Sequence, residues 1–142
     1  MNVLIIEDEN LTAKRLMSLV KRYDASINVL AEIPSVTDAI TWFETNVSTK
    51  VDLIFMDIHL EDGDAFQIIT KLNLNVPIIF TTAFDEYMIK AFKVNSIDYL
   101  LKPINYEELA AAIDKFKSLR SNNNDLQFEL MQDDITQLLK QL

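Results

Sequence analysis

The sequence contains no cysteine and only one histidine, His59, among its 142 residues. Without thiols the chain can form neither disulfides nor zinc–thiolate sites, and it cannot use thiolate catalysis. A single imidazole also excludes histidine-rich metal sites and argues against a Ser-His-Asp triad.

Glycine is equally scarce, because Gly63 is the only one in the sequence. Nucleotide sites of the dinucleotide-fold and P-loop types need several glycines to bring the backbone close to phosphate. The net charge of −9 is unfavourable for contact with nucleic acid phosphates. Composition therefore argues against these nucleotide sites and against direct DNA binding by these residues.

No apolar run approaches the roughly 20 residues that a membrane-spanning helix needs. The N-terminus, MNVLIIEDEN, has neither a basic segment nor a small-residue cleavage site, so it does not resemble a signal peptide. Hydrophobic residues make up 49% and charged residues 25% of the chain, a balance typical of globular proteins. We expect a cytoplasmic protein of one domain with a short appendage and no membrane contact.

Short apolar runs alternate five times with amphipathic helical patterns. The runs cover residues 3–6, 27–33, 53–56, 77–80 and 97–101. Strands that alternate with helices predict a parallel sheet, and runs such as LIFM and IIF are typical of strands buried on both faces. We therefore predict an α/β fold, a five-stranded doubly wound parallel sheet with five helices.

Two helix starts are recognisable. Ser35 follows Pro34 and can cap the second helix, and Asn105 with Glu108 resembles a capping box that opens the fifth. The third helix is expected around Phe66, after a turn at 61–63, and the fourth over about 85–94. The predicted buried stripes are Val36, Ala39, Ile40 and Phe43 in the second helix and Leu109, Ala112, Ile113 and Phe116 in the fifth.

The character of the sequence changes after Arg120, where residues 121–124 form a polar break. The apolar positions beyond it are spaced 3, 4, 3, 4, as in a heptad seam; they are Phe128, Met131, Ile135, Leu138 and Leu142. We predict a domain over 1–120 and a helical tail or linker over 121–142. The tail either dimerises or links domains, or it packs back on the domain or is a remnant of a truncated chain.

Polar residues follow four of the predicted strands: Glu7 and Asp8, Asp57, Thr82, and Lys102. The carboxyl ends of parallel strands meet at one edge of the sheet, where ligands bind in such folds. Three neighbouring carboxylates repel one another, so either one is protonated or a cation lies among them. Hard oxygen ligands favour Mg²⁺ or Mn²⁺. A metal, an ionised aspartate, a hydroxyl and a lysine suffice for phosphoryl transfer, which depends on positioning and charge stabilisation.

Each of these residues also has a purely structural explanation. The helix dipole favours acidic residues such as Glu7 and Asp8 before a helix, Asp57 and Thr82 can form caps or turns, and Lys102 can be a solvated lysine. The joint pattern, with each group at the end of a strand, favours the functional interpretation. The lone His59 imidazole is a poor metal ligand, and the backbone carbonyl of His59 is a better one.

Four motifs resemble the receiver (chemotaxis-regulator-like) family of two-component response regulators over roughly residues 1–120: LIIEDE, LIFMDIHLEDG, IIFTTA and DYLLKP. The run TTAFDEYMIKAFKVNSIDYLLKPI further resembles receivers that precede a LytTR-type DNA-binding domain. The resemblance implies a flavodoxin-like fold with strand order 2-1-3-4-5. It also implies a phosphoacceptor protein rather than an enzyme.

The resemblance assigns the metal site and the acceptor. Asp57 would accept the phosphoryl group and ligate Mg²⁺. Asp8 would ligate the ion directly, Glu7 through water, and His59 through its backbone carbonyl. His59 and Phe84 would flank the site and tune the lifetime of the phosphoryl group. Glu61 stands where many members have proline, a departure expected to loosen the turn without affecting the chemistry.

The resemblance also assigns the switch. Thr82 and Lys102 would bind the phosphoryl oxygens, the ring of Tyr99 would turn inward on activation, and the Lys102-Pro103 bond would be cis. The implied partners are a sensor histidine kinase and a second copy, bound through the face of the fourth helix, fifth strand and fifth helix or through the tail. DNA would be contacted only by an output domain outside this chain. A stand-alone receiver or a relay module remains the alternative.

Two other classes are weaker. A haloacid-dehalogenase-type phosphatase carries a second aspartate two residues after its nucleophile, where this chain has His59. A flavodoxin-like flavin binder needs a phosphate loop rich in Ser, Thr and Gly after the first strand. The chain has Glu7-Asp8-Glu9 there, which would repel phosphate.

Overall fold

A computed structural model of the chain describes residues 1–83 and 98–121. Its elements are, in chain order, β1 (Asn2–Ile6), α1 (Asn10–Tyr23), β2 (Asn28–Ile33), α2 (Val36–Thr45), β3 (Leu53–Asp57), β4 (His59–Leu60), β5 (Gly63–Asp64), α3 (Ala65–Leu72), β6 (Ile78–Thr82), β7 (Asp98–Leu101) and α5 (Tyr106–Ser121). The helix predicted at 85–94, Phe84 and the predicted tail from 122 onward lie outside the described residues.

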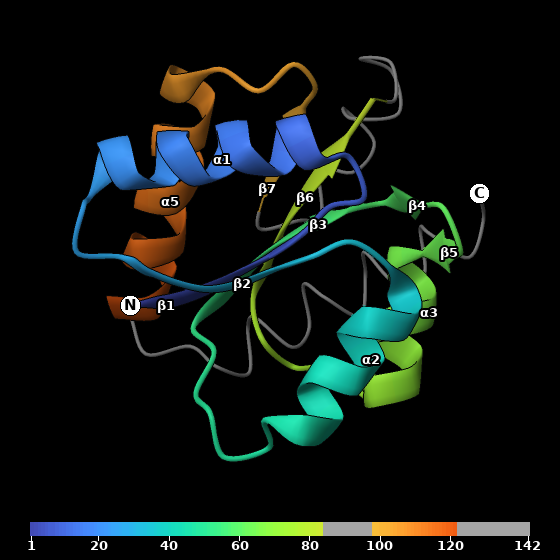
Figure 1. The fold of residues 1–142 in the computed structure, drawn as a ribbon. Coiled ribbons are helices and arrows are strands. Elements are labelled where there is room, and N and C mark those ends of the chain that lie inside the picture. The colour runs from blue at the N-terminus through green and yellow to red at the C-terminus, as the bar shows by residue number, and fades with distance from the viewer. Residues whose placement is uncertain (84–97, 122–142) are drawn as a thin grey trace.

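The five long strands form one parallel sheet in the order β2-β1-β3-β6-β7, which confirms the predicted order (Figure 1). β3 and β6 are central, and every residue in both is buried, as their uninterrupted apolar sequences indicated. β2 lies at an edge of the sheet, and most of its residues are partly exposed.

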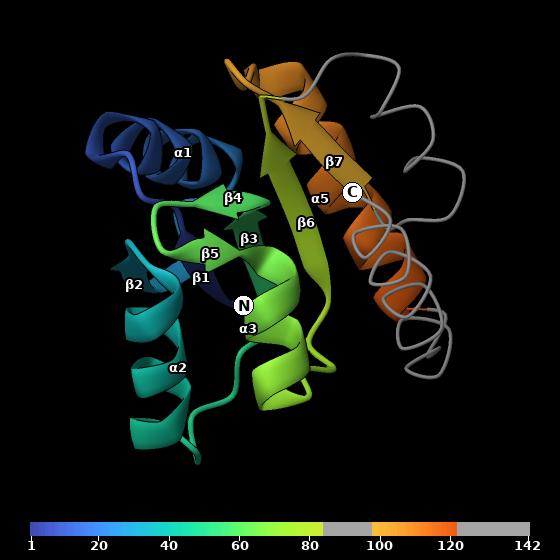
Figure 2. The ribbon, with the colours of Figure 1, turned by 90° about the vertical axis from the view of Figure 1, so that its right-hand side faces the viewer.

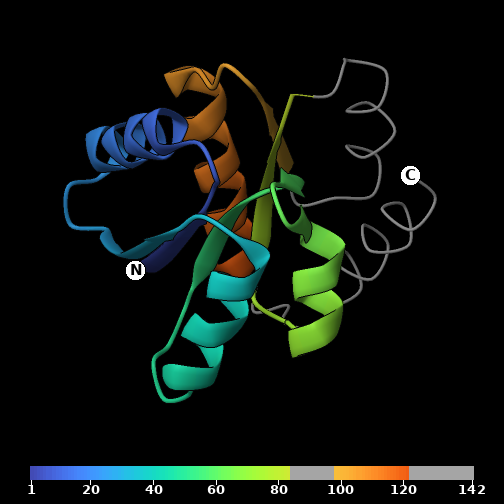
Figure 3. The same cartoon turned by 45° about the vertical axis from the view of Figure 1, so that its right-hand side comes forward.

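Helices cover both faces of the sheet (Figures 1 and 3). α1 and α5 pack on one face, and α2 and α3 pack on the other. Each face has its own apolar core; Leu16, Val20, Ile113 and Phe116 belong to the first core and Ala39, Ile68, Ile54 and Phe80 to the second. The sheet is thus covered by helices on both faces, the doubly wound arrangement that was predicted.

Both predicted helix starts are confirmed. Ser35 Oγ accepts a hydrogen bond from the amide of Asp38 at 3.0 Å, and Asn105 Oδ1 accepts one from the amide of Glu108 at 2.8 Å. The predicted stripe of α5 is fully buried. The predicted stripe of α2 is only partly buried: Val36 and Ala39 are buried, whereas Ile40 and Phe43 are half-exposed. Phe43 borders an open cavity between the ends of α2 and α3.

The segment after β3 differs from the prediction. Instead of a simple turn, β4 and β5 form a short antiparallel hairpin that pairs His59 with Asp64 and Leu60 with Gly63 (Figure 2). Asp64 then caps α3 in a capping box with Gln67. The turn residues were correctly identified, but a two-residue strand is too short to show any periodicity.

The fourth sheet strand, β6, also extends further than predicted. Thr81 and Thr82, which follow the predicted run 77–80, belong to the strand. Thr81 pairs with Asp57 of β3 and Leu100 of β7, and Thr82 pairs with Leu101 of β7. Threonine is branched at Cβ and suits a strand, so these polar residues continue the ladder. In the part of the chain that the structure describes, no helix is long and apolar enough to cross a bilayer.

Candidate functional site

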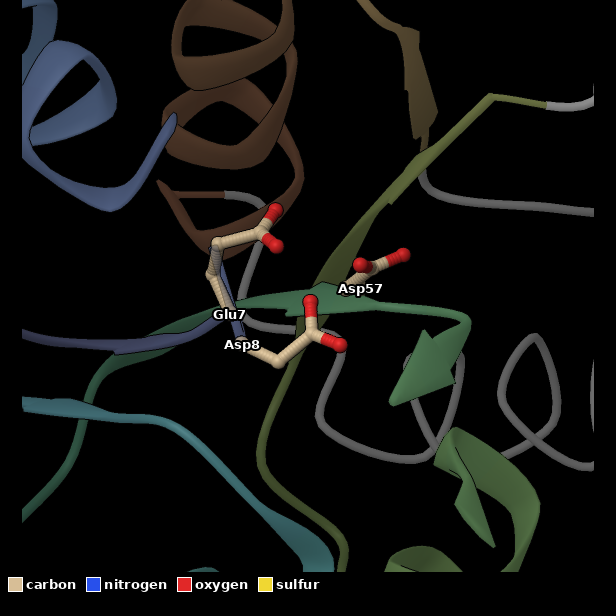
Figure 4. Close-up of side chains that lie close together, drawn as sticks. All are labelled: Glu7, Asp8 and Asp57. Atoms are coloured by element: carbon tan, nitrogen blue, oxygen red, sulfur yellow. The ribbon is translucent and has the colours of Figure 1, made fainter. Parts of the chain in front are cut away.

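Three carboxylates meet at the carboxyl edge of the sheet. Glu7 and Asp8 directly follow β1, whose line is prolonged by a 2.9 Å hydrogen bond from the Glu7 amide to the carbonyl of Ile33. Asp57 is the last residue of β3, the neighbouring strand. One carboxylate oxygen from each of the three lies within 4.8 Å of the others (Figure 4). Sheet topology thus joins groups that are 50 residues apart in the sequence.

Lys102, at the end of β7, reaches into this cluster. Its Nζ lies 2.6 Å from Glu7 Oε1 and 2.9 Å from Asp57 Oδ2. Its backbone amide donates to the carbonyl of Thr82 at 2.8 Å, which prolongs the pairing of β7 with β6. The lysine side chain is 20% exposed and the Glu7 side chain 1%, so the cation neutralises part of a nearly buried cluster.

Lys102 does not fully balance the negative charge of the carboxylate cluster. Burial raises the pKa of Glu7 to about 7, with repulsion from Asp57 adding to it, although the bonds from Lys102 and from the Glu9 amide oppose this. Burial alone would lower the pKa of Lys102, but its bonds to Glu7 and Asp57 raise it. One lysine therefore does not fully compensate three carboxylates, and Glu7 is only partly ionised near neutral pH.

The donor set fits a hard divalent cation. Three carboxylates offer only oxygen ligands, the type that Mg²⁺ and Mn²⁺ prefer, and Asp8 is partly exposed, so water can complete the coordination sphere. A divalent charge would also favour ionised Glu7 over its protonated form. Geometry and charge are thus both compatible with the predicted magnesium site.

His59 contacts the acceptor through its backbone. The His59 amide donates to Asp57 Oδ1 at 3.3 Å, and its side chain is exposed. Among the described residues, the acidic cluster that could hold an ion consists of Glu7, Asp8 and Asp57, without the imidazole. The role of the His59 carbonyl as a ligand stays a prediction.

The predicted switch residues Thr82 and Tyr99 lie on the neighbouring strands β6 and β7. Thr82 is fully buried at the end of β6. Tyr99, in β7, is 2% exposed, and its ring stacks on that of Phe80 at a centroid distance of 5.9 Å. The Lys102–Pro103 peptide bond is cis. The structure therefore brings Thr82 and Lys102 to the site and places the Tyr99 ring in the interior.

A contact of the hairpin with α2 was not predicted from the sequence. The Asp62 carboxylate accepts hydrogen bonds from the Val36 amide at 2.8 Å, the Thr37 amide at 3.1 Å and the Thr37 hydroxyl at 3.0 Å. These bonds attach the loop that follows Asp57 to the start of α2. The partners are 25 and 26 residues apart, so no local motif could have indicated the contact.

The fold and this arrangement of charges define the chain as a receiver. Residues 3–114 match the model of the response regulator receiver domain. The chain belongs to this family, whose members take part in two-component signal transduction and are in general not enzymes.

Several curated relatives show which response regulators this chain resembles. The chain is 33% identical over 139 residues to the sensory transduction protein LytT of Bacillus anthracis, covering 96% of this chain and 55% of the relative. It is 40% identical over 118 residues to LytT of Enterococcus faecalis, covering 81% and 47%. It is 36% identical over 118 residues to the positive alginate biosynthesis regulatory protein of Pseudomonas aeruginosa, covering 81% and 46%. The chain is therefore homologous to LytT/LytR-type regulators and spans about half their length.

Solved structures of response regulators have the same fold as this chain. The response regulatory domain of mrkE from Klebsiella pneumoniae superimposes with a TM-score of 0.69 at 26% identity, covering 86% of this chain and 99% of that one. A two-component response regulator from Clostridium difficile gives a TM-score of 0.66 at 27% identity, with coverages of 83% and 96%. The flavodoxin-like receiver fold is thus confirmed.

Proposed function

We propose that this chain accepts a phosphoryl group on Asp57, with Mg²⁺, from a sensor histidine kinase. The observation that carries the proposal is the convergence of Glu7, Asp8 and Asp57 within 4.8 Å around a lysine whose Nζ contacts both Glu7 and Asp57. Asp57 and its oxygen Oδ2 thus lie beside the charges that would stabilise a transferring phosphoryl group.

The reaction is a displacement at phosphorus. An Asp57 carboxylate oxygen forms a bond to the phosphorus of the donor, phosphohistidine or an acyl phosphate. The bond from phosphorus to the donor breaks, and its electron pair leaves with the imidazole or carboxylate. Lys102 moves from a bond with the Asp57 carboxylate to one with a phosphoryl oxygen, and Thr82 donates its hydroxyl to another. Mg²⁺, held by Asp8, Asp57, the His59 carbonyl and, through water, Glu7, would neutralise charge on the equatorial oxygens.

Phosphorylation would then change the neighbouring surface. It adds negative charge and strong acceptor oxygens, which draw in the ends of β6 and β7 through Thr82 and Lys102. The consequence is a population shift on the face that includes β7 and α5, where a second copy would bind. In the active state the Tyr99 ring would lie inward, and the burial of this residue supports that assignment.

The output belongs to residues outside this chain. The names of the relatives include regulators of sensory transduction and of alginate biosynthesis. Together with the half-length coverage, they support a parent protein with a LytTR-type DNA-binding domain and a role in transcription. The domain limits, 1–120 with a linker or tail over 121–142, are part of the same proposal. A stand-alone receiver or relay module is the alternative.

The test is the mass of the intact protein after incubation with acetyl phosphate and Mg²⁺. We expect a labile gain of one phosphoryl group that EDTA prevents and that Asp57→Asn abolishes. No gain in the wild-type protein, with either acetyl phosphate or a phosphorylated histidine kinase, would contradict the proposal. Light scattering with and without beryllofluoride, a phosphoryl mimic, tests dimerisation; a monomer in both states would exclude it.

A further inference from the structure

Few local hydrogen bonds hold the backbone of the loop that carries Lys102. Lys102 makes the last bond to β6, through its amide and the carbonyl of Thr82. The next residue, Pro103, has no N–H to donate. Ile104 is buried, and Asn105 already caps α5. The position of the Lys102 side chain thus depends on how the backbone from 103 to 104 is held.

Arg15, on α1, supplies such a contact. Its Nε and Nη2 donate to the carbonyl of Ile104 at 3.2 and 2.9 Å, across 89 positions of sequence. Two donors from one planar guanidinium fix the direction of a carbonyl more closely than a single ammonium donor could. Arg15 is itself exposed, so burial of its side chain does not explain its presence.

This contact joins the two loops that form the site. α1 begins just after Glu7 and Asp8, and the carbonyl of Ile104 lies two residues after Lys102. A cavity of about 310 Å³ opens between α1 and this loop, lined by Glu9, Thr12, Arg15, Leu16, Lys102, Pro103 and Ile104. Side chains do not fill this space, so on this side of the loop the hydrogen bonds from Arg15 add a restraint to the one that the buried Ile104 side chain provides.

We propose that Arg15 is a positioning residue for phosphoryl transfer: by holding the Ile104 carbonyl it keeps Lys102 Nζ between Glu7 and Asp57. The inference rests on the proposed function, because it concerns how Lys102 is presented to the acceptor. Small misplacements of a catalytic group are costly in rate, so the effect should appear in kinetics more than in stability.

The experiment measures the rate of phosphorylation of the full chain by acetyl phosphate and Mg²⁺. We expect Arg15→Met to slow it about tenfold and Arg15→Lys, which keeps one donor group, to fall between this variant and wild type. The matched control is Lys14→Met. It removes the same charge from the neighbouring position of α1, where Lys14 contacts only the Glu32 carboxylate among the ion pairs of the described residues, and should change the rate less than about twofold.

A double-mutant cycle with Lys102→Met separates positioning from a general structural effect. If Arg15 acts through Lys102, Arg15→Met should cause no further loss in the Lys102→Met protein, whose slow reaction is followed at high donor concentration. A wild-type rate in Arg15→Met, or an equal loss in both backgrounds, would overturn the inference. If Arg15→Met does not fold by circular dichroism, Arg15→Lys takes its place in the cycle. Failure of the wild-type protein to react at all would instead refute the proposed function.

Discussion

Lys102 Nζ lies 2.6 Å from Glu7 Oε1, yet the pKa of Glu7 is about 7 because burial outweighs this ion pair. The ion pair and the desolvation of the carboxyl group act in opposite directions, as expected when a charge is taken out of water. Near neutral pH the site therefore alternates between a neutral and an ionised Glu7, and this makes two of its properties depend on pH.

The first is the stability of the metal-free protein. The pKa of Glu7 is raised in the folded state above its ordinary value of 4.5. Between about pH 4.5 and 7 the unfolded chain loses this proton while the folded protein keeps it, so the contribution of Glu7 to the free energy of unfolding falls as the pH rises. It levels off above about pH 7.

Urea unfolding in EDTA at pH 5, 6 and 7.5 checks this, with Glu7→Gln as the comparison because an amide does not titrate. The free energy of unfolding of the wild-type protein relative to Glu7→Gln should decrease across the series. A constant difference between the two proteins would show that Glu7 has an ordinary pKa.

The second property is affinity for Mg²⁺. Because the ion favours ionised ligands, a proton on Glu7 competes with it. Below about pH 7 the dissociation constant for Mg²⁺ should fall by up to about tenfold for each unit of increase in pH. Above about pH 7 it should level off. Titration calorimetry at pH 6, 7 and 8 measures it. Glu7→Gln should bind more weakly and with a flatter dependence on pH, so an equally steep dependence in this variant would assign the competing proton to another group.

The sequence predicted the sheet because burial on both faces forces a strand to be apolar throughout, as in β3. It also predicted that Asp57 and Lys102 would lie near each other, since the strand order brings their strand ends to one edge. It could not predict the contacts of Arg15 with Ile104 or of Asp62 with α2. Those partners are set by side-chain geometry across 25 to 89 residues, and no local pattern encodes them.

Gly63 is the next residue to test. Its φ is +157°, and a Cβ built there would lie 1.8 Å from Gln67 Oε1 and 3.1 Å from Val36 Cγ2. Gly63→Ala would therefore displace the Gln67 side chain from its bond to the Asp64 amide and strain the hairpin. We expect a loss of about 1–3 kcal/mol in the free energy of unfolding.

Thermal or urea unfolding measures the loss, with Glu61→Ala as the control because Glu61 is an exposed turn residue of the same hairpin. The control should remain close to wild type. A Gly63→Ala protein as stable as Glu61→Ala would mean that Gln67 moves aside without cost and that the capping box contributes little.

Asp62 provides the last test, because its carboxylate attaches the hairpin after Asp57 to the start of α2 through three hydrogen bonds. The amides of Val36 and Thr37 lower the pKa of Asp62. A lowered pKa means that the stabilisation is present above the ordinary value of 3.8 and is lost as the pH falls through the folded value.

Asp62→Asn keeps the shape of the side chain but removes its charge and one acceptor oxygen. We expect a lower midpoint of thermal unfolding at pH 7 and a smaller difference from wild type below about pH 3.8. Asp38→Asn serves as the control, because it removes an exposed charge from the first turn of α2, the turn to which Asp62 binds. Equal losses in the two variants would mean that the helix dipole, and not the attachment of the hairpin, accounts for the effect.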